Sequence, residues 1–135
     1  MNQPPALAHF EWRVIPLETH TAAENMALDE ACAHAIAERK AKPTIRFYRW
    51  KPSAVSIGYF QSLRAEVDLE ECKKQKVDVV RRRTGGGAVY HDYEGEITYS
   101  VIAPEHGFAP NIVESYRQVA DWIIAGLKPL NVNAE

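Results

Sequence analysis

The pattern of hydrophobic and polar positions first predicts a long amphipathic helix near the N-terminus. Residues 21–24 read TAAE, a capping box in which Thr21 and Glu24 satisfy each other's free backbone amides. Apolar residues then recur at helical spacing as far as about Lys40. The predicted buried face consists of Leu28, Cys32, Ala35 and Ile36.

Alternation of apolar and polar residues predicts strands further along the chain. The segments PTIRFYRW (43–50) and AVSIGYF (54–60) flank a turn-like KPS, and we expect them to pair as a hairpin. A third strand, VDVVR (77–81), follows. The segments AVYHD (88–92) and EITYSVIA (96–103) predict two more strands, joined by a short turn into a second hairpin.

Two further helices are predicted by the placement of charged and capping residues. Residues 66–75, EVDLEECKKQ, carry acids early and lysines late, which suits the dipole of a short helix. The last helix begins at Asn111, with Glu114 at the capping-box position. We expect this helix to bury Tyr116, Val119, Ala120, Ile123 and Leu127. Residues 127–135, LKPLNVNAE, predict the start of another strand.

These elements predict an α+β fold with a mixed or largely antiparallel sheet flanked by helices, incomplete at its C-terminus. The chain has 135 residues, of which 46% are hydrophobic and 25% charged, as expected for one compact domain. The net charge of -2 argues against a nucleic-acid partner. No apolar run is long enough to span a membrane, and residues 1–13 lack the features of a signal peptide.

Cysteine usage gives no sign of a metal site or a disulfide. Cys32 and Cys72 are far apart and lack metal-ligand spacing, so we expect reduced thiols in a cytoplasmic protein.

The segment RRRTGGGAVYHDY (81–93) carries the clearest functional pattern. Three consecutive glycines let a ligand lie directly against the backbone, and the preceding arginines add permanent positive charge. The spacing fits neither the P-loop nor the dinucleotide-binding motif. Two interpretations therefore stay open: an anion cradle of another kind, or a glycine-rich turn with solvated arginines.

Three segments together resemble the lipoate-protein ligase family: RRRTGGGAVYHD (81–92), ENMALDEA (24–31) and RFYRWKPSAVSIGYFQ (46–61). The resemblance runs from about residue 12 to the end. It implies the fold of the biotin and lipoate ligase catalytic domain. It also implies a two-step reaction, in which lipoate and ATP with Mg²⁺ form lipoyl-AMP, and a lysine of an acceptor domain then attacks this adenylate. The implied acceptors are the E2 subunit of a 2-oxoacid dehydrogenase and the H protein of glycine cleavage.

The resemblance also implies site residues, with Arg82 facing the nucleotide phosphate. The residues implied to bind ATP and lipoyl-adenylate are Arg82, Thr84, Gly85, Gly86, Gly87, Ala88, Val89, Tyr90 and His91. The implied acyl pocket consists of Phe47, Val55, Ile57 and Gly58. For His91, a position beside the ligand and a hydrogen-bonded structural role stay open. Asn25, Asp29 and Glu30 are interpreted as a solvated face or as residues that dock the helix.

The sequence departs from the family at its essential lysine, which lies in a strand downstream of the last predicted helix. Lys128, before Pro129, lacks the expected surroundings, so no catalytic residue and no metal ligand is assigned within the chain. We therefore interpret residues 1–135 as the N-terminal portion of a single ligase-like catalytic domain, inactive alone and completed by a C-terminal chain or segment.

Two alternatives remain. One is an octanoyltransferase of lipoate biosynthesis, which would take the acyl group from acyl carrier protein through a cysteine other than Cys32 and Cys72. The other is a non-catalytic ligand-binding subunit that needs a complementing chain.

Overall fold

The computed structural model describes residues 9–135. Residues 1–8, which belong to the N-terminal stretch that lacks the features of a signal peptide, lie outside the described residues. The strands are β1 (Arg13–His20), β2 (Thr44–Trp50), β3 (Ala54–Ile57), β4 (Asp78–Arg81), β5 (Val89–His91) and β6 (Thr98–Ile102). The helices are α1 (Ala22–Ala37), α2 (Leu63–Glu66), α3 (Leu69–Lys74) and α4 (Ile112–Leu127), with short 3-10 helices η2 (Glu105–Gly107) and η3 (Lys128–Leu130).

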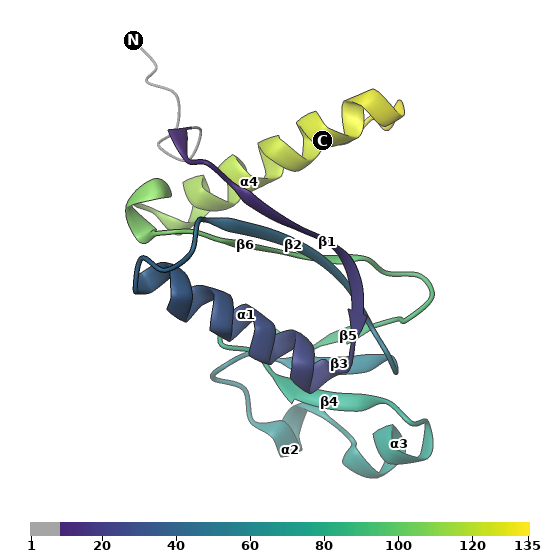
Figure 1. The fold of residues 1–135 in the computed structure, drawn as a ribbon. Helices are drawn as coiled ribbons and strands as arrows, with labels where there is room; N and C mark the ends of the chain where they lie inside the picture. The colour runs from purple at the N-terminus through teal and green to yellow at the C-terminus, as the bar shows by residue number, and fades with distance from the viewer. Residues whose placement is uncertain (1–8) are drawn as a thin grey trace.

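The strands form two separate three-stranded sheets, ordered β1-β2-β6 and β4-β3-β5. In each sheet the central strand pairs with one neighbour in parallel and with the other antiparallel. The predicted α+β class with a mixed sheet is therefore confirmed. Figure 1 shows α1 on one side of the first sheet, next to the second sheet, and α4 on the other side.

Both predicted hairpins are wrong. The strand at 44–50 pairs with β1 and β6, whereas the strand at 54–57 pairs with β4 and β5. Strand β1 was not predicted, because its sequence RVIPLETH is mostly exposed and does not alternate cleanly. Strand β1 pairs with one edge of β2, and β6 pairs with the other edge. The next strand along the chain, β3, therefore cannot pair with β2 and forms the centre of the second sheet.

Helix α1 begins as its capping box predicts. The Thr21 side chain accepts a hydrogen bond from the Glu24 amide at 3.3 Å, and the Glu24 carboxylate accepts one from the Thr21 amide at 2.9 Å. The buried face differs in part from the prediction, because Leu28 is 36% exposed while the polar Asn25 is fully buried. The buried residues of α1 are Ala22, Asn25, Cys32 and Ile36.

The core lies where α1 meets both sheets. Tyr48 and Trp50 of β2 pack with Ala22 of α1 and Ala54 of β3, so a small apolar cluster joins the two sheets. Residues 44–50 alternate between two faces as predicted, but the buried face carries Thr44, Arg46, Tyr48 and Trp50, whereas the apolar Phe47 on the other face is 38% exposed.

Helix α4 begins where predicted, but it buries little. Asn111 accepts a hydrogen bond from the Glu114 amide at 2.9 Å, which confirms the cap. None of its residues is buried, and Tyr116 is 73% exposed, so the predicted burial of this face is wrong. Trp122 of the helix contacts Trp12, the residue before β1, edge-on, with the ring centroids 5.7 Å apart.

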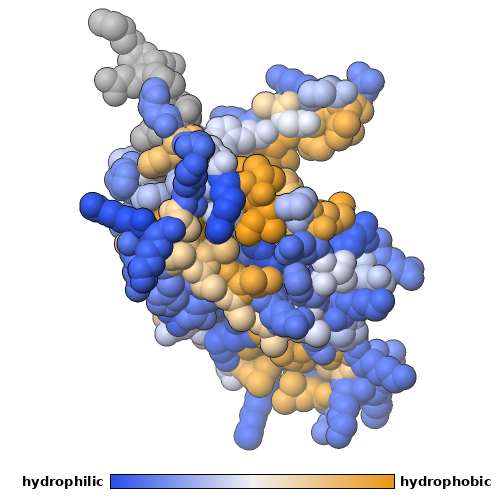
Figure 2. All heavy atoms as spheres, in the orientation of Figure 1, coloured by the Kyte–Doolittle hydropathy of each residue, from blue (hydrophilic) through white to orange (hydrophobic). Residues whose placement is uncertain are grey.

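The chain beyond α4 forms η3 instead of the predicted strand. Apolar residues are also exposed on the face of the first sheet that lies away from α1, including Val14, Phe47 and Tyr99. The strand registers place these three residues on the same face. Figure 2 shows apolar side chains gathered below α4 and on its underside. Within the described residues, no helix is long and apolar enough to cross a membrane.

Candidate functional site

A cavity of about 820 Å³ runs along β6, the edge strand of the first sheet, and is bounded by α1, α4 and the loop after β4. Its apolar lining includes Met26, Ala33, Ala37, Val101, Phe108 and Val119. Its charged and polar lining includes Asp29, Arg82, Arg83, Thr84, His91 and Ser100. The cavity therefore combines a largely apolar wall with a cluster of polar groups at the glycine loop.

Arg82 organises the glycine loop through its guanidinium group. Its Nη1 donates to the backbone oxygen of Ser56 at 2.9 Å and to the Ser56 Oγ at 2.8 Å. Its Nη2 donates to the carbonyls of Gly85 at 3.0 Å and Gly87 at 2.8 Å. The four Nη protons thus have four acceptors within the protein.

The glycines of this region are required for different steric reasons. A Cβ on Gly58 would lie 2.1 Å from the carbonyl oxygen of Gly86, so the loop packs directly against the end of β3. Gly86 has a φ of +93°, which side-chain-bearing residues rarely adopt. Gly85 and Gly87 would instead meet nothing within 4 Å, so the space beside them is open to a ligand.

His91 is a buried residue with both ring nitrogens engaged. Its Nε2 lies 2.7 Å from the Ser56 Oγ, and its Nδ1 lies 2.7 Å from a carboxylate oxygen of Glu96. The ring stacks on Trp50 with centroids 4.1 Å apart, and the residue is 7% exposed. The ring also lines the cavity, so the two interpretations left open for His91 are compatible.

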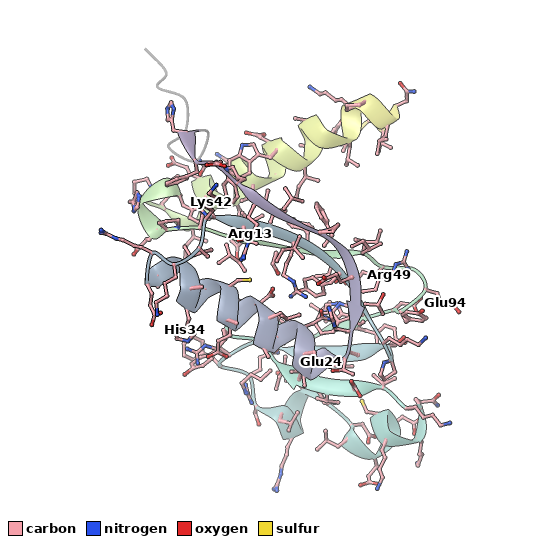
Figure 3. All side chains as sticks on the ribbon, viewed as in Figure 1. Arg13, Glu24, His34, Lys42, Arg49 and Glu94 are labelled. Atoms are coloured by element: carbon pink, nitrogen blue, oxygen red, sulfur yellow. The ribbon has the colours of Figure 1, made fainter. Side chains whose placement is uncertain are left out.

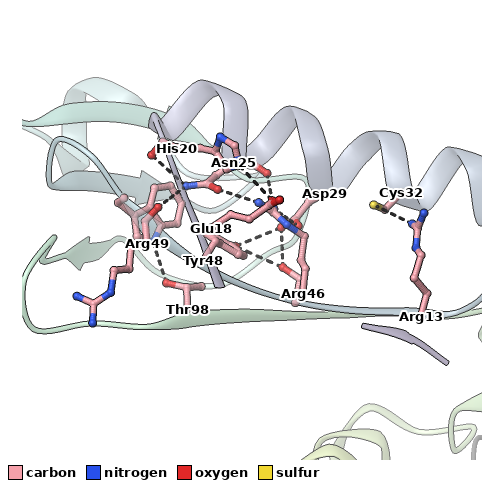
Figure 4. Close-up of polar contacts among 12 residues, drawn as sticks. Arg13, Glu18, His20, Asn25, Asp29, Cys32, Arg46, Tyr48, Arg49 and Thr98 are labelled. Atoms are coloured by element: carbon pink, nitrogen blue, oxygen red, sulfur yellow. Dashed lines mark hydrogen bonds and ion pairs between the residues drawn. The ribbon is translucent and has the colours of Figure 1, made fainter. Parts of the chain in front are cut away.

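A second polar cluster lies between α1 and the first sheet (Figure 4), and its members Asp29, Tyr48 and Ser100 also line the cavity. The Arg46 guanidinium is 1% exposed and donates to Asp29 at 2.7 Å and to the side-chain oxygen of Asn25 at 2.8 Å. The other Asp29 oxygen accepts from the Ser100 hydroxyl at 2.7 Å. Burial, together with the nearby Asp29 charge, raises the pKa of Tyr48 to about 12.

This cluster confirms that Asn25 and Asp29 dock α1, whereas Glu30 stays at the surface, 3.6 Å from Arg83. Arg46 was not assigned any role from the sequence. An arginine in a strand usually faces solvent, and the only sequence signal for its burial is the spacing of two that places Arg46 on the same face as Tyr48 and Trp50.

The predicted nucleotide-site residues divide into two groups in the structure. Arg82, Thr84, Gly85 and His91 line the cavity, whereas Gly86, Gly87, Ala88, Val89 and Tyr90 are not among its lining residues. Val89 and Tyr90 lie on β5 with exposed side chains. Together with Arg83, which also lines the cavity, these nine residues make up the continuous segment 82–91, from the end of β4 through β5.

The predicted acyl-pocket residues are not brought together at the cavity. Phe47 lies on the sheet face away from α1, Ile57 is buried in β3, and Gly58 supports the glycine loop. None of Phe47, Val55, Ile57 and Gly58 is among the lining residues. The helical spacing of Met26, Ala33 and Ala37 was the sequence signal for the apolar wall that the structure shows.

Several charged side chains lie away from this cavity, at the two ends of β2. Figure 3 shows Arg49 and Glu94 near the turn between β5 and β6, and Lys42 at the opposite end of β2. Arg49 donates to the carbonyls of Tyr93 at 3.1 Å and Glu94 at 3.0 Å, so it braces that turn. Within residues 9–135, no cluster of three or more potential metal ligands occurs.

Comparison with known proteins gives the class of this chain. The model of the lipoyl protein ligase A/B catalytic domain matches residues 21–135, so the chain belongs to that family. Among curated relatives, octanoyltransferase LipM of an Exiguobacterium species is 44% identical over 92% of this chain and 45% of the relative. Octanoyltransferase LipM of Bacillus subtilis is 42% identical over 91% of this chain and 44% of the relative.

Solved structures agree with the fold. A bi-partite lipoate protein ligase from Thermoplasma acidophilum, studied with its E2 lipoyl domain, gives a TM-score of 0.73 at 35% identity over 94% of this chain and 48% of that one. A lipoate-protein ligase A bound with ATP gives 0.71 at 34% identity over 91% of this chain and 48% of that one. The chain thus spans less than half the length of these relatives.

Proposed function

We propose that this chain forms the N-terminal part of a catalytic domain that transfers an octanoyl group to a lysine of an acceptor domain. The observation that carries the proposal is the set of relatives named octanoyltransferase LipM, among them two that are 44% and 46% identical to this chain. The ligase structures cited above are 34% and 35% identical. Octanoyl transfer, the alternative in the sequence interpretation, is thereby preferred over ATP-dependent ligation.

The geometry of Arg82 supports this preference. Its four Nη protons already bind Ser56 and the carbonyls of Gly85 and Gly87. A nucleotide phosphate would have to displace these carbonyls before it could pair with the Nη groups. An acyl thioester carries no charge at its carbonyl and needs no such displacement.

The apolar wall of the cavity suits the tail of the acyl group. At about 0.8 kcal/mol for each buried CH₂, an octanoyl tail contributes roughly 5 kcal/mol when it is fully buried. Gly85 lies where the apolar wall meets the loop, so we place the acyl carbonyl there and the tail toward Ala33 and Val119.

The reacting group is proposed to come from the rest of the domain. Cys32 is buried and accepts a hydrogen bond from Arg13 at 3.4 Å, Cys72 lies on α3, and neither lines the cavity. We propose that residues 1–135 bind and orient the acyl group, while a complementing segment supplies the cysteine and completes the acceptor site. We assign the reaction to the cytoplasm, with the E2 lipoyl domain or the H protein as acceptor.

A lipoate ligase that uses ATP and Mg²⁺ through lipoyl-AMP is the second candidate. It is favoured by the fold shared with the ATP-bound ligase at a TM-score of 0.71. In that case Arg82 and the strip from Thr84 to His91 would bind the adenylate. A ligand-binding subunit without catalytic activity is the third candidate.

Calorimetric titration of the purified chain tests the binding site. We expect octanoate to bind and ATP with Mg²⁺ to give no heat of binding. Ala33→Trp fills the apolar wall and should abolish octanoate binding, whereas Ala27→Trp, on an exposed part of α1 outside the cavity, should leave it unchanged. Binding of ATP with Mg²⁺, with or without octanoate, would favour the ligase instead.

A further inference from the structure

We propose that Ser56, His91 and Glu96 form a directional hydrogen-bond relay that positions Arg82, and through it the glycine loop at the cavity. The relay starts at Glu96, before β6, passes through His91 of β5 and Ser56 of β3, and ends at Arg82 after β4. It therefore connects Ser56 of β3 to residues 26 and 35 positions further along the chain, Arg82 and His91. Its role in acyl binding rests on the proposed function.

The direction of each hydrogen bond follows from the chemistry of its ends. The Arg82 guanidinium only donates, so the Ser56 Oγ must accept from it at 2.8 Å. The Ser56 proton then has the His91 Nε2, at 2.7 Å, as its acceptor. A carboxylate only accepts, so the His91 proton lies on Nδ1 and points to Glu96 at 2.7 Å.

This assignment requires neutral His91 with its proton on Nδ1. A second proton on Nε2 would leave the Ser56 hydroxyl proton without its acceptor in a fully buried position. Unsatisfied buried polar groups are costly, so the hydrogen bonds favour the tautomer with its proton on Nδ1. The charged groups that face the His91 ring are Glu96 directly and Arg82 through Ser56.

The far end of the relay is fixed to the core. The Thr98 hydroxyl donates to the same Glu96 oxygen, and Thr98 in turn accepts from the Trp50 indole at 2.7 Å. The His91 ring stacks on that same indole. The relay thus connects a rigid aromatic core to the loop, whose Gly85 and Gly87 carbonyls Arg82 binds.

The same three side chains have the spacing of a nucleophilic triad, but they do not form one. The Ser56 side chain is fully buried, and its oxygen already accepts from Arg82. A nucleophile must reach its substrate with a free lone pair. Ser56, His91 and Glu96 are therefore positioning residues.

Nitrogen-15 NMR of the chain tests the relay without any ligand. At neutral pH we expect His91 to carry a protonated Nδ1 and an unprotonated Nε2. In Ser56→Ala, the amide resonances of Gly85, Gly86 and Gly87 should shift, because Arg82 loses the Ser56 Oγ that helps to fix the guanidinium binding this loop. The amide resonances of α1 should keep their positions. Ser62→Ala, at an exposed serine whose side chain caps no amide, is the matched control and should change nothing.

A His91 proton on Nε2 at neutral pH, or glycine amides that ignore Ser56→Ala, would overturn the relay. Titration with octanoate separates this outcome from failure of the proposed function. We expect Ser56→Ala to weaken octanoate binding about tenfold relative to Ser62→Ala. If the loop amides respond to Ser56→Ala but the unmodified chain binds no octanoate, the relay stands and the proposed function fails.

Discussion

Replacement of Asp29 by Asn tests the buried ion pair that docks α1. The Arg46 guanidinium is 1% exposed, and Asp29 is its only carboxylate partner among the ion pairs of the described residues. The substitution keeps the size of the side chain but removes the charge that compensates a buried cation. Breaking a buried pair from one side costs about 3–5 kcal/mol.

We place the expected loss for Asp29→Asn near the lower end, about 3 kcal/mol, because two polar partners of Arg46 remain. These are the backbone oxygen of Asn25 at 2.9 Å and its side-chain oxygen at 2.8 Å. Urea unfolding followed by circular dichroism measures the loss as a lower midpoint at unchanged m-value. Glu30→Gln, the neighbouring acid whose partners are exposed, should change stability by less than about 0.5 kcal/mol. A loss below about 1 kcal/mol for Asp29→Asn would show that the pair does not hold the helix.

Three further predictions concern Tyr48, the glycines and the α4 cap. The raised pKa of Tyr48, about 12 against an ordinary 10.0, means that the folded state holds this proton more tightly, so the unfolding free energy should fall as pH rises from 10 to 12. Tyr48→Phe should remove that fall, and an unchanged pH profile would contradict it. Gly85→Val, at a cavity-lining position where an added Cβ meets no protein atom within 4 Å, should abolish octanoate binding while the circular dichroism spectrum is retained, and unchanged binding would show that no ligand lies against this glycine. Asn111→Ala should cost about 1 kcal/mol in urea unfolding through loss of the α4 cap, and no loss would show that the cap is not stabilising.

Local signals in the sequence predicted most helices and strands, but they did not predict which strands pair with each other. The capping residues Thr21 and Asn111 start their helices as predicted, because a cap depends only on residues a few positions away. Strand partners depend on contacts between distant segments. The parallel pairing of β1 with β2 spans the whole of α1, and no local pattern in RVIPLETH indicated it.

The candidate site was also predicted only in part. The glycine loop and His91 were found from a contiguous motif, and the structure places them beside the cavity. The acyl pocket was assigned to strand residues such as Phe47 and Ile57 through the family resemblance, and the structure does not bring these residues to the cavity. The actual position of the apolar wall depends on how α1 and α4 flank β6, which only the packing of the elements determines.

Mass spectrometry of an acceptor lipoyl domain tests the central claim most directly. The chain, completed by its complementing segment, is incubated with the acceptor and octanoyl-acyl carrier protein without ATP, and in parallel with lipoate, ATP and Mg²⁺. Octanoyl transfer predicts a single octanoylated lysine in the first reaction and an unmodified acceptor in the second. A lipoylated acceptor in the second reaction, with pyrophosphate released and no octanoylation in the first, would contradict it.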